Sequence, residues 1–255
     1  MTALGAIRCV WLRHFDVYRK SFAYALVTTF AEPLLYLFSF GFGLGSLVGT
    51  VKLLGIELTY RQFIFAGIVG QTLLFQGFFE AAYGSFVRMY YQRIFQAIAV
   101  TPITLSEVLW AEIMWDASKA TFSASVVIGI GILMGDFSRS GALAAIPLCF
   151  AGATLFAALG LLVAAKSRTV EEISYPQYLL VFPMFLFCGV FFPLSMLPRY
   201  LQWLAWGLPL TSIVSLMRTL TLGTPLQPQG FIVITVWLAV LVPWSRQAMS
   251  RRLIK

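Results

Sequence analysis

The amino-acid sequence predicts an all-α protein that crosses a membrane six times, and three observations predict this fold class. Its 255 residues are 60% hydrophobic and 11% charged, whereas an ordinary soluble domain is about 45–50% apolar and about 25% charged. A soluble chain of this size could not hide so much apolar surface in one core. The apolar residues also gather into long runs with basic residues at their flanks. We therefore expect one transmembrane domain over residues 1–255.

Residues 1–20 predict an amphipathic helix that lies at the cytoplasmic face of the membrane. The apolar face consists of Leu4, Ile7, Trp11, Phe15 and Tyr18. Each of these positions lies within about 60° of the next on a helix of 3.6 residues per turn. The segment carries too many polar residues for the core of a cleaved signal peptide.

Six apolar runs predict the spans. Their residues are 22–48, 63–83, 117–134 with a start as early as 108, 142–165, 178–192 and 231–244. Pro183 predicts a kink in the fifth run, because proline removes a helix hydrogen bond.

Residues 193–222, between the fifth and sixth runs, predict two short re-entrant helices that form an outer gate. Pro193, Pro198 and Pro209 divide this apolar segment. Residues 197–206 and 210–222 remain, and at 1.5 Å per residue each reaches roughly half-way across a membrane. One irregular seventh span is the alternative, which the prolines disfavour.

Lysines and arginines predict that both termini lie in the cytoplasm. With six alternating spans, twelve basic residues fall on the cytoplasmic side and five on the outer side, and such a bias in short loops sets orientation. The net charge of +8 thus indicates membrane topology and not a nucleic-acid partner. The cytoplasmic residues are Arg8, Arg13, Arg19, Lys20, Arg88, Arg93, Lys166, Arg168, Arg246, Arg251, Arg252 and Lys255. The outer residues are Lys52, Arg61, Arg139, Arg199 and Arg218.

The sequence predicts no enzyme active site, no bound cofactor and no metal site. The single histidine, His14, has no neighbours that complete a triad or a metal set. Residues 160–167 differ from a nucleotide-binding P-loop, because Ala165 replaces the second glycine and the segment ends an apolar helix. We therefore expect that this chain does not hydrolyse ATP itself.

Small residues form a seam on one face of the second span. They are Gly67, Gly70, Gly77, Ala81 and Gly84. Small residues let helix backbones approach closely in lipid. The favoured interpretation is packing inside the bundle, and the alternative is a seam between two copies of the chain.

Ionisable residues inside the spans are candidate functional groups, because burying them in hydrocarbon is costly. Glu112, Asp116 and Lys119 fall on one face of the third span, where Asp116 and Lys119 can pair. Glu32 lies in the first span and Glu80 near the inner end of the second. Two interpretations stay open. The charges form a polar track or lock between helices, or the acids sit in the headgroup layer while the lysine snorkels to it.

Residues 86–102 predict a short amphipathic helix on the cytoplasmic side that docks a cytosolic partner. A passive interfacial helix is the alternative. Arg88 and Arg93 are the candidate docking charges. The full set of candidate contacts is Arg88, Tyr90, Tyr91, Gln92, Arg93 and Pro102.

These motifs together resemble the ABC-2-type permeases, the membrane subunits of ATP-binding-cassette exporters. The resemblance covers nearly the whole chain, and Pro193, Pro198 and the Leu-Pro-Leu of residues 208–210 are its more specific parts. The other segments that carry it are residues 32–38, 41–45, 83–89, 92–93, 111–120, 191–194, 197–198, 211, 218 and 222–223.

The resemblance implies a permease that moves an amphiphilic cargo across the bacterial inner membrane, such as a lipo-oligosaccharide, a lipid-linked glycan or a hydrophobic drug. It implies a homodimer in membrane lipid with two cytosolic ATPase subunits, which bind the ATP and Mg²⁺. It also implies that residues 86–102 are the coupling helix and residues 193–222 the short outer helices. A proton-coupled secondary transporter that uses Asp116, Lys119 or Glu32 is the alternative.

Overall fold

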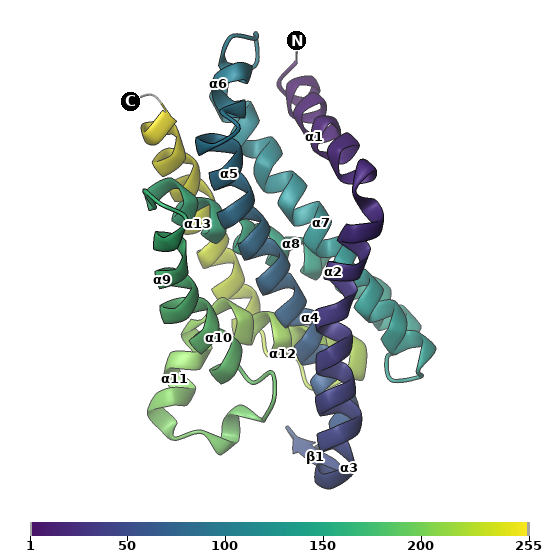
Figure 1. The fold of residues 1–255 in the computed structure, drawn as a ribbon. Helices are drawn as coiled ribbons and strands as arrows, with labels where there is room; N and C mark the ends of the chain where they lie inside the picture. The colour runs from purple at the N-terminus through teal and green to yellow at the C-terminus, as the bar shows by residue number, and fades with distance from the viewer. Residues whose placement is uncertain (1, 254–255) are drawn as a thin grey trace.

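The computed structural model describes residues 2–253, apart from the side chains of residues 25, 26, 28–30 and 99. Long helices run side by side along the molecule (Figure 1). Helices α1 (Ala3–Lys20) and α13 (Gln229–Leu253) bring the two ends of the chain to the same end of the bundle, which we call the terminal end. Lys255, one of the predicted cytoplasmic charges, lies outside the described residues.

Five helical stretches within the described residues are long and apolar enough to cross a membrane. They match the predicted first, second, third, fourth and sixth spans, and confirm a multi-pass, almost all-α membrane protein. Their bounds are Ala31–Val48, Tyr60–Tyr90, Leu105–Leu133, Arg139–Lys166 and Gln229–Leu253.

The predicted fifth span is a shorter, composite helix. It joins η3 (Glu171–Ile173), α9 (Ser174–Pro176), η4 (Gln177–Val181) and α10 (Phe182–Phe187). The helix stops at Phe187, before the predicted end at residue 192, because Gly189 has a left-handed φ of 77° that ends helices. The count of six spans therefore stays a prediction.

The first span contains α2 (Phe22–Tyr36), the π-helix η1 (Leu37–Leu44) and α3 (Gly45–Val48). A hairpin of β1 (Thr50–Leu53) and β2 (Ile56–Thr59) follows, with Thr50 opposite Thr59. Its turn is Leu54–Gly55, where both residues have positive φ. This hairpin departs from the all-α prediction and marks the end of the bundle opposite the termini, the hairpin end (Figure 1).

The second span extends further than predicted. Helix α4 (Tyr60–Phe79), the π-helix η2 (Glu80–Gly84) and α5 (Ser85–Tyr90) form one helix of 31 residues. The prediction of a separate helix from residue 86 is therefore wrong. Ser85, Phe86 and Met89 are buried in the bundle. Their burial stabilises helical turns beyond the predicted end of the second span. The separate helix is α6 (Ile94–Ala99), and it follows Arg93, whose φ is 51°.

Helix α7 (Leu105–Leu133) begins earlier than the predicted third span. Its start is fixed by a capping box in which Thr104 and Glu107 bond each other's backbone N–H groups. The residues of α7 before position 117 are therefore helical, and they place Glu112 and Asp116 in the interior of the bundle.

Helix α8 (Arg139–Lys166) lies at the centre of the bundle and packs against α4, α7, α12 and α13. The small-residue seam of α4 and η2 faces inward. A Cβ on Gly67 would lie 2.7 Å from the carbonyl oxygen of Val190, and one on Gly70 would lie 2.6 Å from Val214. Internal packing is thus confirmed, and the alternative of a seam between two copies is wrong for these buried glycines.

The segment after α10 holds η5 (Leu194–Met196), α11 (Arg199–Gly207) and α12 (Pro209–Leu222). Pro198 precedes α11 and Pro209 is the first residue of α12, where proline fits a helix start. Two separate helices are present, as predicted, and α12 is buried whereas α11 is largely exposed. Their re-entrant placement in a membrane stays a prediction.

Helix α1 packs against α7, but not through the whole of the predicted face. The buried residues are Ala6, Val10 and His14, whereas Leu4 and Phe15 are exposed. The face of α1 that packs inward is therefore rotated from the predicted apolar face. The rotation lets His14 reach the carboxylate of Glu112 on α7.

Candidate functional site

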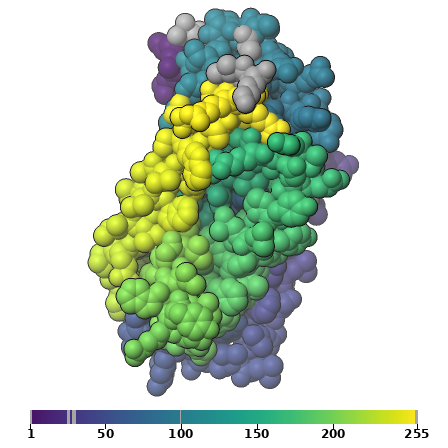
Figure 2. Space-filling view, turned by 90° about the vertical axis from the view of Figure 1, so that its left-hand side faces the viewer, coloured from purple at the N-terminus to yellow at the C-terminus, as the bar shows by residue number. Residues whose placement is uncertain are grey.

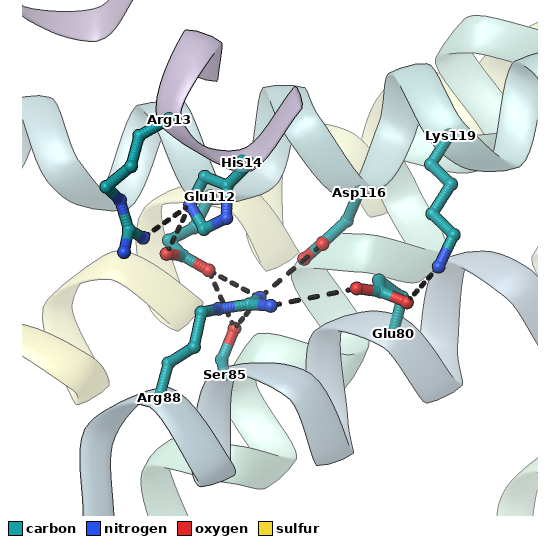
Figure 3. Close-up of polar contacts among 8 residues, drawn as sticks. All are labelled: Arg13, His14, Glu80, Ser85, Arg88, Glu112, Asp116 and Lys119. Carbon is teal, nitrogen blue, oxygen red and sulfur yellow. Dashed lines mark hydrogen bonds and ion pairs between the residues drawn. The ribbon is translucent and has the colours of Figure 1, made fainter. Parts of the chain in front are cut away.

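Six charged or ionisable side chains meet in the interior between α1, the long helix Tyr60–Tyr90 and α7 (Figure 3). They come from sequence positions more than one hundred residues apart. This charge cluster consists of His14, Glu80, Arg88, Glu112, Asp116 and Lys119.

Arg88 lies at the centre of the cluster. Its Nη2 is 2.6 Å from Oε2 of Glu112 and 3.7 Å from Oδ1 of Asp116, and its Nη1 is 3.6 Å from Oε1 of Glu80. Ser85 donates a hydrogen bond of 3.2 Å to Glu112. The Arg88 side chain is 12% exposed and both acids of α7 are 1% exposed. One guanidinium therefore compensates charges on three buried or half-buried acids, which would be costly if left alone.

Lys119 pairs with Glu80 and not with Asp116. Its Nζ lies 2.5 Å from Oε2 of Glu80, and also 5.3 Å from the ring centre of Tyr18. The predicted Asp116–Lys119 pair is wrong, because α7 turns the lysine toward η2. Together the Arg88 and Lys119 pairs join the long helix to α7 at two levels.

His14 joins α1 to the same cluster. Its Nε2 lies 2.9 Å from Oε1 of Glu112, and its ring stacks on Trp115 with 5.6 Å between the ring centres. Arg13 lies beside it, with Nη2 3.2 Å from Nε2 of His14, and burial lowers the pKa of this arginine. These contacts hold α1 on α7.

Asp116 has the least satisfied carboxylate of the cluster. Neither of its oxygens accepts a hydrogen bond from any described residue, although the residue is 1% exposed. Unpaired buried carboxylates are strongly disfavoured. The burial of Glu112 and Asp116 inside the bundle favours a lock between helices over direct exposure to a headgroup layer.

A cavity of about 470 Å³ opens beside the charge cluster. His14, Glu80, Arg88 and Lys119 line it, together with Tyr83. Tyr83 donates a 2.8 Å hydrogen bond to Gln177 in η4, which ties the long helix to the composite helix of residues 171–187. The cluster therefore has free volume into which its side chains can rearrange.

Glu32 lies apart from the cluster. It sits in α2, which packs against α4 and η1. The sequence grouped Glu32 with the other intramembrane acids, but the structure does not bring it to them.

Five of the six predicted docking residues are exposed at the terminal end, and Arg88 is not. Tyr90 is 58% exposed and Tyr91 63% exposed. Gln92, Arg93 and Pro102 are exposed as well. We call residues 90–93 the α5–α6 turn. Helix α6, which follows this turn, extends beyond α13 at the terminal end (Figure 1), and Figure 2 shows the blue-teal surface of this region above the yellow of α13. Arg88 is one helical turn earlier and faces inward, so it is an internal residue.

The predicted gate prolines lie in the segment that surrounds η5, α11 and α12. Pro193 and Pro209 are buried and Pro198 is exposed. This segment lies toward the hairpin end, away from the charge cluster (Figure 1). The structure thus separates two groups of predicted residues along the length of the bundle.

Residues 160–167 cannot wrap a phosphate group. Residues 160–166 belong to the helix α8, and a Cβ on Gly160 would lie 2.4 Å from the carbonyl oxygen of Phe78. The glycine serves a close helix crossing. Among the described residues no group of three or more His, Cys, Asp or Glu side chains is placed to hold a metal ion.

Sequence reasoning missed His14, Ser85 and Tyr83 as partners of the buried charges. One signal was present for His14, which follows Trp11 by three residues and precedes Tyr18 by four, so that all three share a face. The π-helices η1, η2 and η4 were also missed. Such bulges often occur at functional sites, and η2 contributes both Glu80 and Tyr83.

Comparison with known proteins gives consistent results over almost the whole chain. The family model described as ABC-2 type transporter matches residues 6–222. Nodulation protein J of Rhizobium meliloti (strain 1021) is 30% identical over 247 residues, which cover 96% of this chain and 93% of that protein. Nodulation protein J of Bradyrhizobium diazoefficiens is 32% identical over 84% of this chain and 80% of its own length. Inner membrane transport permease YadH of Escherichia coli (strain K12) is 24% identical over 94% of this chain and 93% of its own.

Proposed function

This chain belongs to the ABC-2 type transporter family, and from this premise we propose that it is the permease of an exporter driven by separate ATPase subunits. The cargo is amphiphilic: a lipo-oligosaccharide, a lipid-linked glycan or a hydrophobic drug. The membrane is the bacterial inner membrane, a proposal that the similarity to an inner membrane transport permease supports. Two copies of the chain and two cytosolic ATPases form the working assembly.

The exposed α5–α6 turn is the observation that carries this proposal. Two neighbouring tyrosines, Tyr90 and Tyr91, are exposed at the tip of the longest helix. Exposed aromatic residues next to an arginine are typical of protein interfaces. The turn lies at the terminal end, which faces the cytoplasm in the orientation that the lysines and arginines favour.

The charge cluster supports a path from this turn into the bundle. Arg88 precedes the turn on the same helix and reaches acids on α7. A movement of the turn would shift Arg88 among Glu112, Asp116 and Glu80, whose oxygens lie 2.6–3.7 Å from it. Two arrangements of one cluster would provide the bistable element on which ATP binding in the partner must act.

Co-purification tests the docking surface. The paired change Tyr91→Ala with Arg93→Glu removes an aromatic contact and reverses a charge on the exposed turn. We expect recovery of the proposed ATPase subunit to fall about tenfold or more, since interface hot spots contribute about 2 kcal/mol or more. The matched control, Tyr200→Ala with Arg199→Glu, changes exposed residues of α11 and leaves recovery unchanged. Equal recovery with both pairs would refute the assignment of the turn.

A proton-coupled secondary transporter is the second candidate, and the buried carboxylate of Asp116 favours it. Neither oxygen has a hydrogen-bond partner among the described residues, as expected for an acid that exchanges a proton. Transport in vesicles that lack any ATPase, abolished by an uncoupler and by Asp116→Asn, would support this candidate. Transport that needs ATP and the ATPase, and survives the uncoupler, supports the exporter.

A further inference from the structure

A second cavity, of about 220 Å³, lies between the β1–β2 hairpin, α11 and α12, and these elements lie toward the hairpin end of the bundle (Figure 1). We call it the hairpin-end cavity. Its polar lining consists largely of Lys52, Gln202, Ser215, Arg218, Thr224 and Gln227. The mixture of hydroxyl, amide and cationic groups suits a polar ligand, and its volume can hold a small anionic group.

The charged side chains that line the cavity are all cationic. They are Lys52 and Arg218, and none of the described residues that line the cavity is acidic. Arg218 is 5% exposed and forms no ion pair within 4.0 Å with any described acid. A buried guanidinium without a carboxylate partner is uncommon, because the cost of removing it from water is not offset by an opposite charge.

Arg218 is held rigidly. Its Nη2 donates to the carbonyl oxygen of Gly189 at 2.7 Å and to that of Phe63 at 3.1 Å. The guanidinium carbon lies 3.7 Å from the centre of the Phe63 ring, close enough for a cation–π interaction. The charge is therefore fixed in place before any ligand arrives, which lowers the entropic cost of binding.

One edge of this guanidinium remains available. All the hydrogen bonds of Arg218 to described residues use Nε and Nη2. Nη1 makes none, and it is not among the buried polar atoms that lack a partner, so it keeps accessible surface on a side chain that lines the cavity. Guanidinium groups bind carboxylate and phosphate oxygens through such free N–H groups.

Lys52 provides a second, mobile cation. It lies on β1, its side chain is 81% exposed, and its pair with Glu57 across the hairpin is 3.2 Å long. An exposed pair of this kind contributes little stability, so Lys52 can exchange its partner for a ligand. Ser215 and Gln227, already hydrogen-bonded to each other at 3.1 Å, add neutral groups to the same wall.

We propose that the hairpin-end cavity binds an oxyanion, a phosphate or carboxylate group, between Arg218 and Lys52. Nη1 of Arg218 donates to one oxygen, and the Lys52 ammonium closes on the group from the hairpin. The oxyanion is either a free ion or the head group of a lipid-like molecule, and both present the same chemistry to the cavity. The inference does not depend on the proposed ATPase partner.

Calorimetric titration of the full-length chain in an uncharged detergent tests the proposal. The probes are inorganic phosphate and dihexanoyl phosphatidic acid, with dihexanoyl phosphatidylcholine as the comparison without net charge. Binding of phosphate identifies a free-ion site. Binding of phosphatidic acid alone, at least about tenfold tighter than phosphatidylcholine, identifies a head-group site. Both outcomes support the proposal, and binding of neither anionic probe overturns it.

Single substitutions test whether the anion binds between Arg218 and Lys52. We expect Arg218→Gln to weaken the anion about tenfold or more, the loss of one charge-assisted hydrogen bond, and Lys52→Gln to weaken it several-fold. Arg199→Gln removes an exposed charge from nearby α11 and leaves binding unchanged. Because Arg218 also holds the carbonyls of Phe63 and Gly189, its variant can fail to fold, and Lys52→Gln then decides. Unchanged binding in Lys52→Gln overturns the proposal.

Discussion

At the scale of single residues, Arg88 shows how burial changes the role of a charge. The sequence placed it on an exposed docking helix, because residues 86–102 look amphipathic. In the structure it is 12% exposed and lies within 4 Å of three acids. Whether an arginine near a helix end faces solvent or the bundle depends on the rotation of that helix against its neighbours. A single sequence does not contain this information, although it did identify every acid in the cluster.

Removing the charge of Arg88 should destabilise the protein. We expect Arg88→Gln to lower the free energy of unfolding by about 3–5 kcal/mol, because it leaves buried carboxylates uncompensated. The exposed neighbour is the control, and Arg93→Gln should change stability by less than about 0.5 kcal/mol. Denaturant unfolding in detergent, followed by tryptophan fluorescence, measures both. Equal stability of the two variants would contradict the ion pairs described here.

A double-mutant cycle tests whether Arg88 and Glu112 interact directly, apart from the effect of changing either side chain alone. If Arg88 and Glu112 interact directly at 2.6 Å, the double variant Arg88→Gln with Glu112→Gln should lose less stability than the sum of the single variants. Contacting residues typically couple by about 0.5–3 kcal/mol. Additive losses would mean that the two side chains do not act on each other.

At the scale of elements, local signals were predictable and distant packing was not. Prolines correctly divided α11 from α12, since proline at a helix start acts locally. The 31-residue helix Tyr60–Tyr90 was cut short in the prediction, because its last turns are stabilised by burial of Phe86 and Met89. The hairpin was missed because its strands have four residues each, too few for a clear alternation.

The crossing of the long helix and α8 depends on one glycine. A Cβ on Gly160 would lie 2.4 Å from the Phe78 carbonyl oxygen and 2.8 Å from Cβ of Ala81. We expect Gly160→Val to cost about 1–3 kcal/mol or more, because backbone must move to accept it. In α7, a Cβ on Gly129 would meet nothing within 4 Å, so Gly129→Val is the matched control.

Fluorescence-detected size exclusion of the detergent-extracted protein reports the result. Gly160→Val should lose its monodisperse peak at a temperature several degrees below that of Gly129→Val. A Gly160→Val variant as heat-resistant as the control would show that the two helices cross elsewhere.

At the scale of the whole molecule, the bundle separates two polar regions. The charge cluster and the exposed α5–α6 turn lie toward the terminal end, and the hairpin-end cavity lies toward the other (Figure 1). The long helix Tyr60–Tyr90 connects them, because it begins beside the hairpin and ends at the turn. The sequence predicted the membrane-spanning class from composition and charge, and it predicted docking residues at the terminal end from the amphipathic pattern of residues 86–102, without the turn that interrupts them. The cavities depend on how separate helices converge, so they could not be predicted.

Site-specific photo-crosslinking tests most directly whether a cytosolic motor drives this permease from the terminal end. The full-length chain, co-expressed in membranes with the proposed ATPase subunit, carries p-benzoylphenylalanine in place of Tyr91 on the turn or in place of Trp203 on α11, both strongly exposed. We expect a covalent adduct with the ATPase from position 91 and none from position 203. An adduct from position 203, or none from position 91 while the two proteins still co-purify, would contradict it.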